Sequence, residues 1–133
     1  MKKTLLYCAV LILLSKTLNA HTSWKGTVST AWATASNWTA GVPVATVDAI
    51  IGDANFTGSY QPLISGSTAA CKSLTLGSST KVSILTISKN INVSGNLVIG
   101  SNGTITQNAT SVITLKGNWT NSGTYSATLA TAT

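Results

Sequence analysis

Few side chains in this sequence could carry out acid–base chemistry. The carboxylates are Asp48 and Asp53, and the chain has no glutamate and no arginine. Hydrolysis of a glycosidic bond usually needs two carboxylates that flank the bond, and neither aspartate has a recognisable base or partner beside it. We therefore predict no catalytic residue. Asp48 should form a hydrogen bond at the start of a strand, and Asp53 should belong to a turn.

The sequence also has few side chains that could bind a metal or a cofactor. His21 is the sole histidine, and Cys71 is the sole cysteine after residue 20, whereas zinc needs three or four protein ligands. Asp48, Asp53 and Asn55 offer oxygen ligands of the kind that calcium takes, but their spacing matches no calcium-loop motif. The chain also lacks a G-x-S-x-G nucleophile elbow and a glycine-rich phosphate loop. We predict no metal, no cofactor and no enzymatic activity, and a buried apolar position for Cys71.

Three of the four tryptophans lie close together among glycines and a proline. They are Trp24, Trp32 and Trp38. Aromatic rings present flat apolar surfaces, so these side chains are candidates for stacking on a glycan. Alternatively, they form a hydrophobic plug over the first coil of a repeat structure, whose ends need a cover. We favour the plug.

The N-terminal segment, residues 1–20, has the organisation of a secretory signal peptide. Lys2 and Lys3 precede an apolar run over residues 5–14, and the small residue Ala20 follows a short polar stretch. The run is shorter than the roughly 20 apolar residues that span a bilayer. We predict export through the Sec machinery, cleavage after Ala20, and a secreted or cell-surface location. Membrane contact should arise only during export or through later anchoring.

Removal of this segment changes the charge balance. Residues 21–133 keep five lysines against two aspartates, so the net charge falls from +6 to +3. The lysines are scattered, whereas nucleic-acid binding requires clustered basic side chains. Charged residues make up 8% of the chain, against about 25% in ordinary globular proteins. The charge pattern excludes a nucleic-acid partner and leaves a chain dominated by threonine, serine and asparagine.

Short runs of alternating apolar and polar residues dominate the chain from about residue 71. They cover residues 74–76, 85–87, 91–93, 97–99 and 113–115. Such alternation is the pattern of β-strands, and the glycine, asparagine and serine between the runs are typical of corners. Residues 47–51 and 62–64 indicate two earlier strands. No stretch of residues 22–64 has the apolar spacing of a helix.

An internal repeat connects two of these regions. Residues 91–97 align with residues 113–119 at an offset of 22, and residues 102–105 align with residues 122–125 at an offset of 20. A unit of about 20–25 residues with three short strands has the size of one β-solenoid coil. Ile91, Leu97 and Ile105 should then point inward, and the next coil should stack on them about 4.8 Å further along.

The repeat also predicts the corner residues of the coils. Gly95 and Gly117 should adopt the backbone angles that a corner needs and that other residues resist. Asn96 and Asn118 follow these glycines at equivalent positions and should stack as an amide ladder.

We predict an all-β fold, a right-handed parallel β-helix or solenoid with a Trp-rich N-terminal cap. The alternative is a β-sandwich, but its strands are usually five or six residues long, and the 22-residue register favours the solenoid. The expected organisation is a signal peptide over residues 1–20, a Trp-rich capping region over residues 21–70 and solenoid coils over residues 71–133. We expect the coils to be truncated at the C-terminus, because the last residues lack a polar cap.

The order of the conspicuous residues resembles the N-terminal region of large secreted or surface β-solenoid proteins of the adhesin type. Such proteins include Bacteroidetes proteins exported by the type IX system and autotransporter-like adhesins. The matching positions are Trp24, Gly26, Trp32, Asn37–Trp38, Gly41–Pro43, Asp48–Ile51, Pro62–Ile64, Cys71 and Leu74–Leu76. Residues 95–97 and 117–124 resemble the glycine- and asparagine-rich coils of these proteins. The resemblance implies a solenoid that presents a surface outside the cell, and it names no ligand.

The expected function is that of a secreted or cell-surface structural, adhesin-like β-solenoid module without catalysis. Its expected partners are extracellular glycans or host and matrix surfaces. The alternative is a non-catalytic leading module of a secreted carbohydrate-active enzyme, or a carbohydrate-binding domain. A carboxylate- or arginine-lined face on further coils would favour the enzyme, and continued coils of serine, threonine and asparagine would favour the adhesin.

Overall fold

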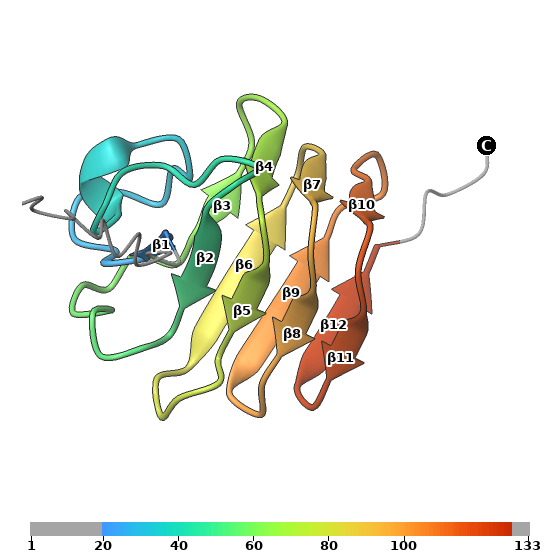
Figure 1. Ribbon diagram of the computed structural model, residues 1–133. Helices are drawn as coiled ribbons and strands as arrows, with labels where there is room; N and C mark the ends of the chain where they lie inside the picture. The colour runs from blue at the N-terminus through green and yellow to red at the C-terminus, as the bar shows by residue number, and fades with distance from the viewer. Residues whose placement is uncertain (1–19, 129–133) are drawn as a thin grey trace, which may run out of the picture.

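The computed structural model describes residues 20–128 (Figure 1). These residues form twelve β-strands and one short 3-10 helix, η1 (Ala35–Asn37). The predicted signal peptide lies outside the described residues apart from Ala20, which directly precedes the first strand. Within residues 20–128, no helix has the length and apolar character needed to cross a membrane.

The strands form three sheets in which every strand pairing is parallel. Sheet I consists, in spatial order, of β1 (His21–Ser23), β2 (Asp48–Ile51), β5 (Leu74–Leu76), β8 (Leu97–Ile99) and β11 (Trp119–Asn121). Sheet II consists of β4 (Ala69–Cys71), β7 (Ile91–Val93) and β10 (Ile113–Leu115). Sheet III consists of β3 (Leu63–Ile64), β6 (Ser83–Ile87), β9 (Gly103–Gln107) and β12 (Thr124–Ala127).

The chain visits the sheets in the same order on every turn, which makes the fold a β-solenoid. Three complete coils follow one another as β4–β5–β6, β7–β8–β9 and β10–β11–β12, and Figure 1 shows them stacked side by side from green to red. Parallel pairing between successive coils excludes the β-sandwich, whose sheets are antiparallel. The predicted all-β solenoid is therefore confirmed.

The observed register agrees with the internal repeat. Ile91 pairs with Ile113 and Leu97 pairs with Trp119, both at the larger offset of the repeat. Ile105 pairs with Tyr125 at the smaller offset. The two offsets differ because the connection between the second and third strands is shorter in the last described coil. There, residues 100–103 separate the paired positions of β8 and β9, but only residues 122–123 separate those of β11 and β12.

The core occupies the space enclosed by the three sheets. Strand side chains alternate between inside and outside, and the burial pattern of β5, β7 and β8 follows that alternation. In-register stacking places Leu74 beside Leu97 and Leu85 beside Ile105, and all four side chains are buried. Burial of such side chains contributes about 1.5–3 kcal/mol each, which is how a chain with few charges and no disulfide in this region gains its stability.

The solenoid begins earlier than the sequence suggested. β2 and β3 lie within the predicted capping region, yet they pair in register with β5 and β6 as members of a first, shorter coil. The predicted boundary at residue 70 also falls inside β4. β2 and β3 agree with the strands predicted at residues 47–51 and 62–64, but the sequence did not show that they form a coil. The residues that precede β2 fold over the end of the core, where Trp24 and Trp38 form an isolated antiparallel bridge.

Candidate functional site

A column of polar side chains runs along one corner of the solenoid, where the strands of sheet I begin. Oδ1 of Asp48 accepts a hydrogen bond from the backbone N–H of Ser73 at 3.1 Å. Oγ of Ser73 accepts from the N–H of Asn96 at 3.2 Å, and Oδ1 of Asn96 accepts from the N–H of Asn118 at 3.0 Å. We call these four residues the corner ladder. In it, each coil satisfies a backbone donor of the next coil.

Another corner has the same kind of bond, in which Oδ1 of Asn90 accepts from the N–H of Val112 at 2.9 Å. A similar bond reaches a strand residue, since Oε1 of Gln61 accepts from the N–H of Ile84 in β6 at 2.8 Å. Corners lie outside the strand ladders, so their backbone donors need side-chain partners or water. The predicted contact between Asn96 and Asn118 is thus found, but as a side-chain-to-backbone bond between successive coils.

Gly95 and Gly117 occupy the predicted corners between β7 and β8 and between β10 and β11. The predicted reason for glycine is wrong, since neither residue has a positive φ. The reason is lack of space. A Cβ on Gly95 would lie 2.5 Å from Oγ of Ser73, and a Cβ on Gly117 would lie 2.6 Å from Oδ1 of Asn96 and still closer to the Gly95 carbonyl oxygen. Glycine lets the corners of successive coils approach each other.

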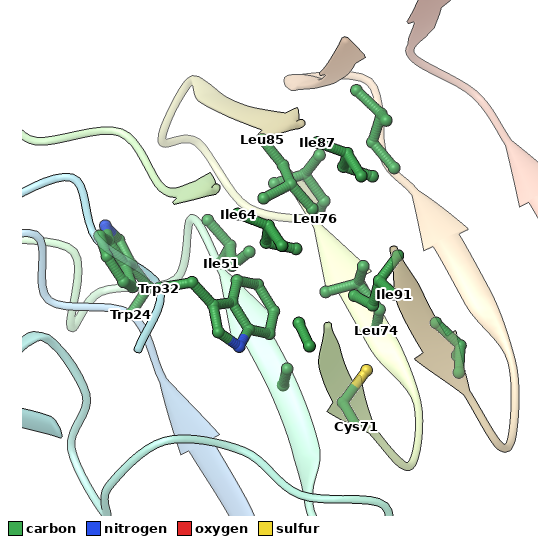
Figure 2. Close-up of a cluster of buried hydrophobic side chains, with 14 of the residues drawn as sticks. Trp24, Trp32, Ile51, Ile64, Cys71, Leu74, Leu76, Leu85, Ile87 and Ile91 are labelled. Carbon is green, nitrogen blue, oxygen red and sulfur yellow. The ribbon is translucent and has the colours of Figure 1, made fainter. Parts of the chain in front are cut away.

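The three N-terminal tryptophans pack against one another at the end of the core. The ring centroids of Trp24 and Trp38 are 5.0 Å apart and those of Trp32 and Trp38 are 4.8 Å apart, both in edge-to-face contact. Figure 2 shows Trp32 beside Ile51 and Ile64, which belong to the first coil, and Trp24 on the other side of Trp32. Trp24 Nε1 donates to the Tyr60 carbonyl at 2.8 Å, and Trp38 Nε1 donates to the Trp32 carbonyl at 2.8 Å.

This tryptophan cluster does not present a ring to a glycan. Trp24, Trp32 and Trp38 have exposed fractions of 0%, 4% and 2%, whereas sugar stacking needs an open ring face. Their burial over the first coil is what the plug interpretation requires. Nε1 of Trp32 is buried without a hydrogen-bond partner among the described residues, a cost of about 1–3 kcal/mol that its packing must offset.

Asn37 organises the loop that carries this cluster, a role that its sequence motif did not reveal. Its side chain is fully buried. Oδ1 accepts from the N–H groups of Val28 and Ser29 at 3.1 Å, and Nδ2 donates to Ser29 Oγ and to the Ala31 carbonyl at 3.1 Å. The amide therefore replaces regular secondary structure as the partner of this loop's backbone.

The two aspartates are engaged in structural hydrogen bonds. Asp48 belongs to the corner ladder. Asp53 accepts from Ser23 Oγ at 2.7 Å, from Asn55 N–H at 2.9 Å and from Asn55 Nδ2 at 3.0 Å. Asp53 therefore lies in a turn, as predicted, and its oxygens face protein donors rather than a shared cation position. Residues 20–128 contain no group of three or more metal-ligating side chains.

Cys71 lies at the end of β4 with its side chain in the core. Burial raises the pKa of its thiol to about 12, and the nearby carboxylate of Asp48 adds to the increase. Since the thiolate is the nucleophilic form of cysteine, this side chain stays protonated and unreactive at neutral pH. His21, at the start of β1, pairs with Asp48 in the sheet, and it belongs to no group of three or more metal-ligating side chains among the described residues.

Tyr60 is exposed near the tryptophan cluster, and two further aromatic side chains open to solvent lie at the other end of the stack. Trp119 and Tyr125 occupy inward positions of the last described coil and are 40% and 38% exposed. Their ring centroids are 5.0 Å apart in edge-to-face contact, and the Tyr125 hydroxyl donates to Gln107 Oε1 at 2.6 Å. The repeat predicted their inward direction, and their exposure follows from their place in the final described coil.

These features define a parallel β-solenoid domain with side-chain ladders at its corners. Residues 23–133 match the family described as Domain of unknown function (DUF8693), and the chain belongs to this family. No curated protein matches the chain. No solved structure matches it either.

Proposed function

We propose that this protein is a secreted or cell-surface structural module of the adhesin type, which acts without catalysis. The observation that supports the proposal best is the corner ladder, because it gives every coil the same means of holding the next one. In a solenoid, each repeat contacts only its neighbours, and stability grows with the number of interfaces. Such a stack suits a stiff spacer that holds a surface away from a cell.

The organisation of residues 1–20 supports export, and the mature chain would start at His21, the first residue of β1. Outside the cell, the protein would rely on its buried aliphatic core and its corner bonds for resistance to proteases. The resemblance to adhesin-type solenoids supports extracellular glycans or matrix surfaces as partners.

A carbohydrate-binding module is the second candidate, and one observation favours it. Trp119 and Tyr125 present aromatic surface at the end of the described coils, where a sugar ring could stack. In that case the chain would serve as a binding domain or as the non-catalytic leading module of a secreted carbohydrate-active enzyme.

The two candidates differ in what they predict for a glycan array. The purified chain from His21 onward would be applied to immobilised polysaccharides and to matrix proteins, together with Trp119→Ala and Trp38→Ala. A structural module of the adhesin type should retain surface attachment in Trp119→Ala. A carbohydrate-binding module should lose glycan binding in Trp119→Ala while it remains folded. Trp38→Ala should lose folding itself, because it removes a buried ring, which typically costs about 3–5 kcal/mol. Absence of attachment to every surface by a folded wild-type chain would argue against adhesion.

A further inference from the structure

Sheet II has three strands, whereas sheet I has five and sheet III has four. Sheets I and III include strands of the first coil, β2 and β3, whereas sheet II starts at β4. The register of β2 against β5 places residues 44–46 opposite β4. That segment forms a turn instead, in which the Val47 N–H donates to the Val44 carbonyl at 2.8 Å. β4 is therefore an edge strand of sheet II.

The edge of β4 presents a free donor and a free acceptor. On the side of β7, Ala69 N donates to Asn90 O at 2.9 Å and Cys71 O accepts from Ser94 N at 3.1 Å. The two backbone groups of one residue in a parallel strand face the same neighbour, and successive residues alternate. The N–H and C=O of Ala70 thus face away from β7, and within residues 20–128 neither has a hydrogen-bond partner. Ala70 is partly exposed and lies in the lining of the adjacent cavity.

A cavity of about 340 Å³ lies beside this edge. Its walls are residues 42–44 on one side and residues 65–70 on the other, and Trp32 and Ile64 contribute apolar surface. No charged side chain lines it. The volume is at the lower end of the range of about 300–1,000 Å³ for binding sites, and the lining favours an apolar, uncharged group.

We propose that this edge and cavity bind an uncharged, extended peptide segment that carries an aliphatic side chain. The peptide backbone pairs with the N–H and C=O of Ala70 and supplies the strand that sheet II lacks in the first coil. The aliphatic side chain enters the cavity. Addition of a strand to a sheet edge, with side-chain pockets for specificity, is a general mode of peptide recognition. The bound peptide would extend the hydrogen bonding of sheet II, and its uncharged side chain matches the uncharged lining of the cavity. This binding does not depend on the function proposed above.

The probe is the blocked tripeptide acetyl-Ala-Leu-Ala-amide, titrated into the ¹⁵N-labelled chain from His21 onward and followed by NMR. We expect saturable shifts confined to the Ala70 amide, the Trp32 indole and residues 65–68. Acetyl-Ala-Gly-Ala-amide should bind at least ten-fold more weakly, because it lacks the side chain for the cavity. 3-Methylbutan-1-ol, which carries a leucine-like side chain without amides, should leave the Ala70 amide unshifted.

Two variants test the two halves of the site. Ala70→Pro removes the free N–H at an edge position, where proline is tolerated, and should abolish the shifts. Ala33→Leu adds bulk to the cavity lining and should weaken binding at least ten-fold, whereas Ala54→Leu, at an exposed position away from the cavity, should bind like the wild type. If Ala70→Pro does not fold, the peptide affinity of Ala33→Leu, compared with that of Ala54→Leu, tests the proposal. Equal responses to the leucine and glycine peptides, unchanged binding by Ala33→Leu, or no saturable shift at millimolar peptide would overturn the proposal.

Discussion

At the scale of single residues, the protein uses chemically different side chains for one task. Asp48, Ser73 and Asn96 differ in charge and size. Each nevertheless places one oxygen where it accepts a hydrogen bond from a backbone N–H of the next coil. Because a backbone donor without a partner is costly, the position selects for an acceptor rather than for a particular residue type. The carboxylate of Asp48 is thereby explained without any catalytic role.

Removal of the Asn96 acceptor should weaken the contact between the last two described coils. We expect Asn96→Ala to lower the free energy of unfolding by about 1 kcal/mol, the usual net value of one hydrogen bond. Asn96→Asp keeps an acceptor oxygen and should lose less. Asn92→Ala, an exposed asparagine outside the ladder on the same coil, is the control and should stay within about 0.5 kcal/mol of wild type. Equal losses in Asn96→Ala and Asn92→Ala in urea unfolding would show that the ladder adds nothing.

Cys71 should make stability depend on pH in the alkaline range. Its pKa is raised from 9.0 to about 12 in the folded protein, so between these values the folded state holds a proton that the unfolded state has lost. The thiol therefore contributes fully below pH 9, and its contribution falls as the pH rises from about 9 toward 12. Urea unfolding at pH 8 and pH 10.5 should show a larger loss for wild type than for Cys71→Ala. Parallel losses in the two proteins would mean that the thiol is not responsible.

At the scale of elements, the solenoid depends on how closely its corners approach. Short strands, from two residues in β3 to five in β6, alternate with short connections, so the corner backbones of neighbouring coils lie in contact. Gly95 and Gly117 stack there, and each has room only for a hydrogen atom. Inward side chains and corner glycines together keep the successive coils in register.

A methyl group at a crowded corner should be more harmful than one at an open turn. We expect Gly117→Ala to destabilise the fold by about 1–3 kcal/mol, the range for overpacked sites. Gly66→Ala is the matched control, because its Cβ would meet no atom within 4 Å and its φ is not positive. Thermal unfolding followed by circular dichroism measures the difference. Comparable stability of the two variants would refute close packing as the reason for glycine at residue 117.

The repeat predicted some elements well because its offset in the sequence equals the offset between paired residues of successive coils. Its larger offset placed Ile91 opposite Ile113 and Leu97 opposite Trp119, as observed. The strands of the first coil were predicted at residues 47–51 and 62–64, but not as part of the solenoid, since their spacing to β5 and β6 differs from that of the repeat. For the same reason, the sequence did not place the acceptors of the earlier coils in one ladder with Asn96.

The candidate site was harder to predict than the strands. Clustering in the sequence brought Trp24, Trp32 and Trp38 together correctly, and their burial agrees with the favoured plug rather than with the alternative of a glycan-stacking face. The open edge at Ala70 results from a strand that residues 44–46 do not form, and an absent pairing leaves no pattern in the sequence. Such sites depend on packing between distant segments.

At the scale of the whole molecule, the protein is a stack whose ends differ. The N-terminal end is closed by buried tryptophans, and the last described coil presents Trp119 and Tyr125 to solvent. Between them runs a continuous aliphatic core without a disulfide in the described region. The end covered by the tryptophans is the N-terminal end of the described fold. The predicted cleavage after Ala20 would leave β1 at the N-terminus of the mature chain.

The most direct test of the proposed extracellular role is to measure whether the protein is exported and cleaved after Ala20. The full chain with a C-terminal tag would be expressed in a diderm bacterium, and the intact mass of the product would be measured in each cell fraction. We predict a product that begins at His21 outside the cytoplasm. Ala20→Phe, which places a bulky residue at the cleavage site, should remain unprocessed. A folded product that retains residues 1–20 and stays in the cytoplasm would contradict the proposed role as an extracellular structural module.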